Sequence, residues 1–387
     1  MTRRSVQELA ERVAQRYYRA DRREKGEILD GFCADTGLHR KAAIRLLSRT
    51  RSTGGRRCPG RPPSYTADAT AALAAVWEHA GRMCGKLLVG VMGELVEALE
   101  RHGELRLSAD VRAQLLHMSA ATVDRRLRPV RTAGRRQPYR ASGVSAGLKQ
   151  EVPVRTWAEW QAVEPGELQV DLVLHCGERT AGSYLATLVA VDAATGWVAL
   201  EPLRSLSAYR VADALHFIQQ RLPVPLRSLH TDNGAEFINH VVVPWCRARG
   251  IRLSRGRSYR KNDQARVEQK NWVAVRRVVG YDRYEGESSY RALRALTTLV
   301  EQQLNFLRPV RRLVGKERVG ARTRKRYDAP LTPHRRMLVA GHLTPEAAAL
   351  LEEHYRSINP AGLQRQIEQR LDRLWDHART PRQERRR

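Results

Sequence analysis

Cysteines are few, and their spacing excludes two kinds of stabilised small domain. No two of them form a C-x-x-C pair; the five are Cys33, Cys58, Cys84, Cys176 and Cys246. This spacing argues against a zinc knuckle and against a disulfide framework. We therefore expect reduced thiols, in the core or on the surface.

Long apolar runs are absent as well. No segment is long and apolar enough to span a bilayer, and the N-terminal string MTRRSVQELAERVAQRYY is charged and has no apolar signal-like stretch. These absences predict a protein of the cytosol or the chromosome, with no membrane partner.

Acidic residues are outnumbered by basic ones. Among 387 residues, 69 are Lys or Arg and 41 are Asp or Glu, which gives a formal net charge of +28. Arg dominates the basic set, and its planar guanidinium can donate two hydrogen bonds at once to a phosphate or a base edge. An excess of this size predicts nucleic-acid binding. The 42% apolar content and the length predict a globular chain of two to four domains.

Residues 1–50 have the pattern of a helix-turn-helix DNA-binding domain. One helix stops at Asp35-Thr36-Gly37, and a second runs from about His39 to Arg49. A small core is expected from Ala34, Leu38, Ile44, Leu46 and Leu47. On the other side of the second helix, the residues expected to meet DNA are Arg40, Lys41 and Arg45. A plain helical hairpin is the alternative.

A second helix-turn-helix domain is predicted over residues 66–130. Its helix from Ala109 to Leu116 is followed by a turn, after which Ser119 can cap the next helix. The side chains expected to face inward are Ala121, Val123 and Leu127, and those expected to face outward are Arg125, Arg126 and Arg128. We expect Arg125 and Arg126 to contact DNA.

Two basic linkers separate these segments from the rest. Residues 51–65 are rich in Gly, Pro and Arg, and their Pro59-Gly60-Arg61-Pro62 is half of an AT-hook. Arg61 is therefore either a minor-groove contact or part of a solvated linker. Residues 131–150 form the second basic linker.

Residues 151–285 have the strand and helix order of an RNase H-like core. The string LQVDLVLH is a nearly continuous apolar run, as expected for a strand buried on both faces. The predicted order is β-β-β-α-β-α-β-α, which is a five-stranded mixed sheet with helices on both faces. Its three helices are expected at Tyr209–Arg221, Glu236–Arg249 and Asp263–Val279. Residues 286–387 form a helical, basic C-terminal region, whose string VRRLVGKERVGARTRKRYDAPLTPHRRML is expected to be irregular, either an arm on DNA or a small domain.

Three acidic residues are placed where they can meet. Asp171 lies inside the predicted central strand, Asp232 follows a short strand in TDNGAEF, and Glu268 lies on the following helix, with 35 residues between the last two. Taken singly, they have ordinary explanations: a satisfied core Asp, a D-N-G turn and a solvated Glu. Together they would repel one another, and a divalent cation removes that penalty. Hard oxygen ligands suit Mg²⁺, with Mn²⁺ as a substitute.

The strings TDNGAEF and VEQKN, with this spacing, resemble the DDE transposases and retroviral-type integrases. The resemblance covers about residues 150–285, and it departs from many integrases at Asn262-Asp263, where they have Asn-Gly. It implies that Asp171 and Asp232 bind one Mg²⁺, and that Asp171 and Glu268 bind a second. It also implies DNA contacts near the cut from Lys261, Asn262, Lys270 and Asn271.

The function implied by the resemblance is that of an insertion-sequence transposase. Such an enzyme cuts the element end and then joins the freed 3′-OH to target DNA by phosphoryl transfer. Its partners would be double-stranded DNA, as terminal repeats and target, and further copies of itself in a synaptic complex. Its location would be cytoplasmic and nucleoid-associated, in a bacterium. Two alternatives are an RNase H-like nuclease and a transposase-derived DNA-binding regulator without catalysis.

Overall fold

The computed structural model describes residues 2–51, 65–131, 163–232, 234–256, 265–319 and 322–378. The two predicted linkers fall almost entirely outside these ranges, and Arg61 lies outside them. The chain divides into two compact units, Met1–Ser64 and Tyr65–Arg387.

The first unit is a bundle of three helices. They are α1 (Arg3–Arg19), α2 (Arg22–Thr36) and α3 (Arg40–Arg51). Asp21 begins α2 with a capping box, and Gly37 ends it in the left-handed conformation at φ 69°. The break and the second helix are thus confirmed. The expected core is wrong at two positions, because Ala34 and Ile44 are exposed. Phe32 of α2 and Ala43 of α3 are buried instead.

The second unit begins with five helices: α4 (Ala67–His79), α5 (Gly85–Arg101), α6 (Ala109–His117), α7 (Ala120–Arg126) and α8 (Arg128–Arg131). The predicted cap is confirmed, since the Ser119 hydroxyl accepts a hydrogen bond from the Thr122 N–H at 3.2 Å. Val123 and Leu127 are buried as expected. Ala121 is exposed, contrary to the expectation.

A five-stranded mixed sheet follows, in the spatial order β3-β2-β1-β4-β5. Its strands are β1 (Glu167–His175), β2 (Leu185–Asp192), β3 (Val198–Leu203), β4 (Ser228–Thr231) and β5 (Arg252–Arg255). The first three strands are antiparallel, and β4 and β5 run parallel to β1. This is the predicted RNase H-like arrangement.

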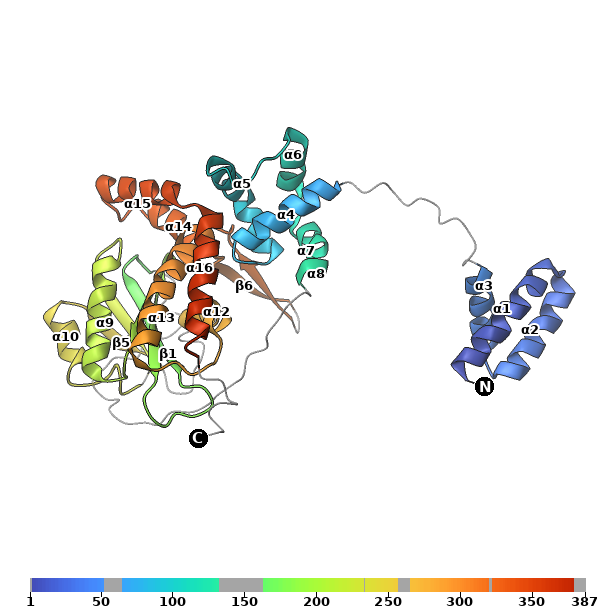
Figure 1. The fold of residues 1–387 in the computed structure, drawn as a ribbon, viewed down its shortest axis with the longest axis horizontal. Helices are drawn as coiled ribbons and strands as arrows, with labels where there is room; N and C mark the ends of the chain where they lie inside the picture. The colour runs from blue at the N-terminus through green and yellow to red at the C-terminus, as the bar shows by residue number, and fades with distance from the viewer. Residues whose placement is uncertain are drawn as a thin grey trace. The chain divides into compact units, whose positions relative to one another are not determined.

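Helices cover both faces of the sheet (Figure 1). One face packs on α9 (Ala208–Arg221) and α10 (Val242–Ala248). The other face packs on α11 (Ala265–Lys270), the π-helical η4 (Asn271–Arg276), α12 (Arg277–Val279), α13 (Gly286–Gln302) and the π-helical η5 (Gln303–Leu307). The helix expected from Glu236 begins only at Val242, because the Asn239 side chain accepts from the Val241 and Val242 N–H groups. The Asp263 start of the third helix lies outside the described residues.

The C-terminal region contains a two-stranded ribbon as well as helices. Its elements are β6 (Leu313–Val319), β7 (Arg322–Tyr327), α14 (Pro333–Val339), α15 (Pro345–Ser357) and α16 (Pro360–Trp375). The expectation of an irregular stretch is therefore wrong for the ribbon. In the part of the chain that the structure describes, no helix combines the length and apolarity that a membrane crossing requires.

Helices α4 to α7 share one hydrophobic core with α13, α14 and α16. Polar bonds add to this contact. The Tyr355 hydroxyl donates to Glu94 at 3.2 Å, and Arg365 donates twice to Glu104, at 2.9 and 2.6 Å. The domain boundaries expected within Tyr65–Arg387 stay predictions.

The outer edge of β3 is blocked by side chains. The Asn305 amide accepts from the Val198 N–H and donates to the Val198 carbonyl, both at 2.8 Å. Glu301 accepts from the Leu200 N–H, and Arg221 donates to the Leu200 carbonyl at 3.1 Å. Pro202, the next outward residue, has no N–H to offer. The edge therefore presents no unpaired ladder groups between Val198 and Leu200.

We expect Asn305→Ala to lower the free energy of unfolding by about 2–4 kcal/mol, because it leaves two buried backbone groups of Val198 without partners. The measurement is urea denaturation of the whole chain. Thr298→Ala, at an exposed position of α13, is the matched control and should change stability by less than about 0.5 kcal/mol. Equal effects of both changes would contradict the role of the amide.

Glu301 should make stability depend on pH. Burial is the main cause that raises the pKa of its carboxyl from 4.5 to about 7, while Arg221 opposes the rise and Glu201 adds to it. The native state therefore keeps a proton that the unfolded chain has lost, and stability falls as the pH rises from about 4.5 to 7. Glu301→Gln should flatten this decline in thermal unfolding measured between pH 5 and 8. Parallel profiles would contradict it.

Candidate active site

The pairing of β1 with β4 bears on two of the predicted carboxylates. The parallel register matches Leu168 with Leu229 and Gln169 with His230, and β4 ends at Thr231. Continued by two residues on each chain segment, this register would set Asp171 beside Asp232. Side chains alternate along a strand, so Asp171 lies on the face that carries Gln169, and the same alternation continued past Thr231 would turn Asp232 to the face of His230. The meeting of the two carboxylates stays a prediction.

That face is the one covered by α11 and η4. The Val267 N–H of α11 donates to the Gln169 side chain at 3.4 Å, which ties the helix to β1 two residues before Asp171. One turn along, the Asn271 amide donates to Asp171 Oδ2 at 2.6 Å. Glu268 lies between these two anchors on α11, and its own side chain lies outside what the structure describes. Its backbone is thus placed beside β1, as predicted, and its convergence with the aspartates stays a prediction.

Asp171 is half-buried, and its two oxygens are held in different ways. Oδ1 accepts from the Leu172 N–H at 2.8 Å, and Oδ2 accepts from Asn271. The other end of the Asn271 amide, Oδ1, is buried and has no hydrogen-bond partner among the described residues. Asn271 begins the π-helical turn η4, and such turns are frequent at functional sites. The site therefore contains an amide oxygen able to accept a further ligand beside a fixed carboxylate.

Asp232 is positioned by the turn that follows β4. The Gly234 N–H donates to Asp232 Oδ1 at 2.9 Å, so the chain bends back around the carboxylate. A side chain at position 234 would meet the Glu236 carboxylate at 2.6–2.8 Å, so a larger residue there would have to displace this flexible side chain. Burial first, and then the charge of Asp232, raise the pKa of Glu236. Sequence reasoning missed this fourth acid, although it stands inside TDNGAEF.

A third buried aspartate, Asp192, serves the fold. Its side chain accepts hydrogen bonds from the Gly166, Ala194 and Thr195 N–H groups at 2.7–3.1 Å, and from the Thr195 hydroxyl at 2.7 Å. Burial raises the pKa of this carboxyl, against the lowering effect of these bonds. Among the side chains that the structure describes, no three His, Cys, Asp or Glu residues form a cluster that could hold a metal ion.

The residues expected to contact DNA near the cut have different positions. Lys261 and Asn262 lie outside the described residues. Lys270 is only 8% exposed, and burial, followed by the charge of Arg308, lowers the pKa of its ammonium to about 7. Its contact with DNA stays a prediction. Asn271 points at Asp171, as described above.

The arginines of the two helix-turn-helix candidates are mostly exposed. On α3, Arg40 forms an ion pair with Asp30, and Lys41 and Arg45 are exposed. On α7, Arg125 is exposed, whereas Arg126 is half-buried and donates to the Thr70 hydroxyl at 3.4 Å. Their DNA contacts stay predictions.

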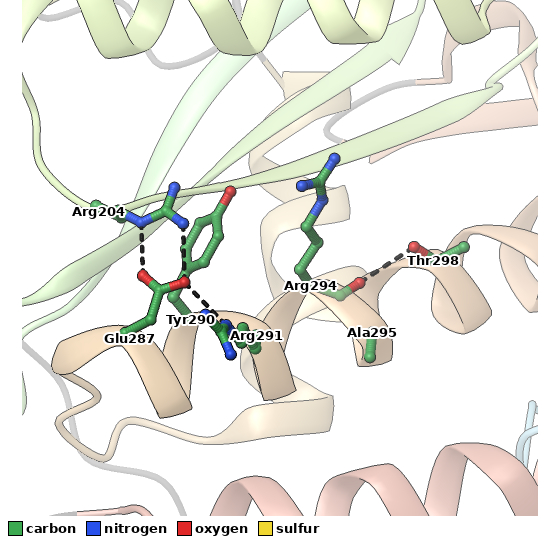
Figure 2. Close-up of a pocket in the computed structure, with 7 residues that line it drawn as sticks. All are labelled: Arg204, Glu287, Tyr290, Arg291, Arg294, Ala295 and Thr298. Carbon is green, nitrogen blue, oxygen red and sulfur yellow. Dashed lines mark hydrogen bonds and ion pairs between the residues drawn. The ribbon is translucent and has the colours of Figure 1, made fainter.

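One open cavity of about 370 Å³ lies away from the carboxylates, between the end of β3 and α13 (Figure 2). The Arg204 guanidinium lies 3.6 Å from the centre of the Tyr290 ring and donates twice to Glu287, at 2.9 and 3.0 Å. Arg291 donates to the same carboxylate at 3.0 Å. The hydrogen bond from Arg204, then that from Arg291, lowers the pKa of Glu287 to about 2. The cavity wall is a network of paired charges, distinct from the site of Asp171.

Comparisons with known proteins find matches to the part of the chain that forms the five-stranded sheet. The family model "Integrase core domain" matches residues 163–261. The Pro-Pol polyprotein of Simian foamy virus type 1 is 34% identical over 88 residues, which are 23% of this chain and 8% of that protein. The crystal structure of the catalytic core domain of BIV integrase matches with a TM-score of 0.31 at 22% identity, over 46% of this chain and 97% of that one.

One relative covers nearly the whole chain. The uncharacterized protein y4rM of Sinorhizobium fredii is 42% identical over 333 residues, 84% of this chain and 93% of that protein. The likeness therefore extends far beyond the matched core into the helical segments on either side. Together with the core match, it shows that the chain belongs to the integrase and transposase catalytic-core family.

Proposed function

We propose that this protein is a DNA transposase of an insertion sequence. It cuts the ends of its element and joins the freed 3′-OH to target DNA. One observation carries the proposal: β1 pairs in parallel with β4 in a register that, continued past Thr231, would set Asp171 beside Asp232, and the helix that bears Glu268 packs on the β1 face of Asp171. Membership of the integrase family and the net charge of +28 support DNA as the substrate.

The donor set suits a hard divalent cation. Asp171 and Asp232 would hold one ion, and Asp171 and Glu268 a second. The Asn271 amide oxygen, which has no partner in the described part of the chain, lies in the same side chain that binds the shared ligand Asp171. Mg²⁺ is the natural occupant, with Mn²⁺ as a substitute. When bound, such ions supply positive charge that stabilises the developing negative charge on the attacked phosphodiester.

The protein's own part is to orient these groups and to admit the DNA. Asn271 and the Leu172 N–H fix the Asp171 carboxylate, and the Gly234 N–H fixes that of Asp232. Both aspartates are half-buried, so neither is fully enclosed by the described residues, as contact with a DNA backbone requires. Holding the reacting groups in one geometry removes much of the entropic barrier. Synapsis of two element ends implies more than one copy of the chain.

We expect Asp232→Asn to reduce joining of element ends by roughly 10³-fold or more, because it removes one of the charged ligands at the shared site. The assay follows strand transfer by the whole chain, with Mg²⁺, on duplexes that carry the inverted repeats flanking the gene. Binding to the same duplexes should be unchanged.

Asp213→Asn is the matched control, since this aspartate lies on α9 and its side chain is 59% exposed. It should leave joining intact. Cutting without joining by the unaltered chain would favour the nuclease. Binding without either reaction would favour the regulator, and loss of both binding and joining in Asp232→Asn would assign that residue to the fold.

Divalent ions should stabilise the protein before any DNA is added. At about 100-fold above the dissociation constant, Mg²⁺ or Mn²⁺ should add about 2–3 kcal/mol to the free energy of unfolding, visible as a rise in Tm. Asp171→Asn and Asp232→Asn should lose this rise, and Asp213→Asn should keep it. A rise of the same size in all four proteins would place the ions elsewhere.

A further inference from the structure

The β6–β7 ribbon is a basic element without a covering layer. Its two strands hold six Lys or Arg residues against one acidic residue, Glu317. Within the described chain, the two strands form a sheet of their own and pair with no other strand. An isolated two-stranded hairpin is at best marginally stable in water. Its basic composition and its lack of further strand partners are therefore typical of an element that binds another molecule.

Both faces of the ribbon are open. Arg324 and Arg326 fall on one face of β7, and Thr323 and Lys325 fall on the other, since side chains alternate along a strand. All four are exposed, as is Arg318 on β6. None of the described ribbon side chains belongs to the hydrophobic core. Cations are thus presented in two opposite directions at once.

The register concentrates positive charge instead of neutralising it. In the ladder, Lys325 is opposite Lys316, and Arg318 is opposite Thr323; only Arg324 has an acidic partner, Glu317. Like charges in directly opposed positions destabilise a strand pair. This cost is recovered when an anionic partner lies along the ribbon.

The base of the ribbon is rigid, in contrast to its exposed strands. Val310 and Leu331 close the base with two backbone hydrogen bonds of 2.8 and 3.2 Å. Asp328 accepts from the Arg312 N–H at 2.6 Å and from Arg336 at 2.8 Å, and Arg336 also donates to the Val310 carbonyl at 3.0 Å. This clamp fixes the direction in which the ribbon leaves the protein.

Two glycines allow the base of the ribbon to pack closely against the rest of the unit. A side chain at Gly196, in the β2–β3 turn, would meet Val310 at 3.1 Å. A side chain at Gly90, on α5, would meet Pro330 at 2.3 Å. The base therefore sits in close contact with both the catalytic sheet and the preceding helices, and any molecule held by the ribbon is held at a set place relative to them.

We propose that the β6–β7 ribbon is a duplex-DNA-binding arm that enters the major groove. A two-stranded ribbon fits that groove, and the six residues of β7 span about 20 Å, along which DNA presents roughly one negative charge per 1.7 Å. Cations on both faces match the two phosphate walls of a groove. An anionic membrane would instead meet a single face with apolar residues at its centre. The inference rests on the proposed function only in taking DNA as the substrate.

The test removes three cations of β7 together, as Arg324→Gln, Lys325→Gln and Arg326→Gln in the whole chain. Binding to a labelled 30-base-pair duplex is followed by fluorescence anisotropy over a range of salt concentrations. Each lost phosphate contact should lower the salt slope by about 0.9, so we expect a decrease of about 3 and a dissociation constant raised at least about tenfold. Since these side chains are exposed, the Tm should not change.

The control carries the same change of charge elsewhere, as Arg356→Gln, Arg370→Gln and Arg373→Gln on α15 and α16, all of them exposed. It should keep the salt slope of the unaltered chain. A ribbon variant that binds with the unaltered slope and affinity would overturn the inference. So would equal losses in ribbon variant and control, because they would reflect net charge alone.

Hydrogen exchange locates the contact directly. Amides of residues 313–319 and 322–327 should gain protection when the duplex is added, and no protection there would refute the proposal. Protection by phosphatidylserine vesicles in place of DNA would also refute it. Asp232→Asn separates this inference from the proposed function: that variant should retain the salt slope and the protection, whether or not it loses joining.

Discussion

The parallel pairing of β1 with β4 is the constraint on which the rest of the site depends. A slip of one residue would turn Asp232 to the face opposite Asp171, because side chains alternate along a strand. The register is fixed at the start of β1, where the Gly166 carbonyl accepts from the Arg227 N–H at 2.8 Å. Asp192, the buried last residue of β2, accepts a hydrogen bond from the Gly166 N–H. Asp192, for which we propose no catalytic role, thus helps to align the strands that carry Asp171 and lead to Asp232.

Sequence reasoning reached the sheet because its signals are local and strong. The apolar runs at 167–175 and 185–192 are long enough to indicate buried strands, and the order of strands and helices then limits the topology to few choices. Asp171 was singled out for a related reason, since a carboxylate inside an apolar run is costly unless something binds it. Asp232 was singled out by its place after a short strand and by the string TDNGAEF, which resembles that of integrases and transposases.

Other features depend on contacts that a pattern cannot contain. Asn271 and Asp171 are 100 residues apart, and their hydrogen bond exists only once α11 lies on β1. Lys270 was expected to contact DNA near the cut, and its burial beside Arg308 is set by packing that its neighbours in sequence do not reveal. The ribbon was missed because Lys and Arg are poor indicators of strands, and its pairing is set by the clamp at Asp328 and Arg336. The helix that carries Glu268 packs on β1, whereas the Glu268 side chain lies outside the described residues.

The obstructed border of β3 limits how copies of this protein can join. Many assemblies grow by laying a strand of one molecule alongside the outermost strand of another. Here the positions such a strand would occupy are filled by Asn305, Glu301 and Arg221, and the next residue is a proline. A second copy cannot extend the sheet from that side without expelling these side chains. Any multimer formed around two DNA ends must therefore be built through surfaces other than this edge of the sheet.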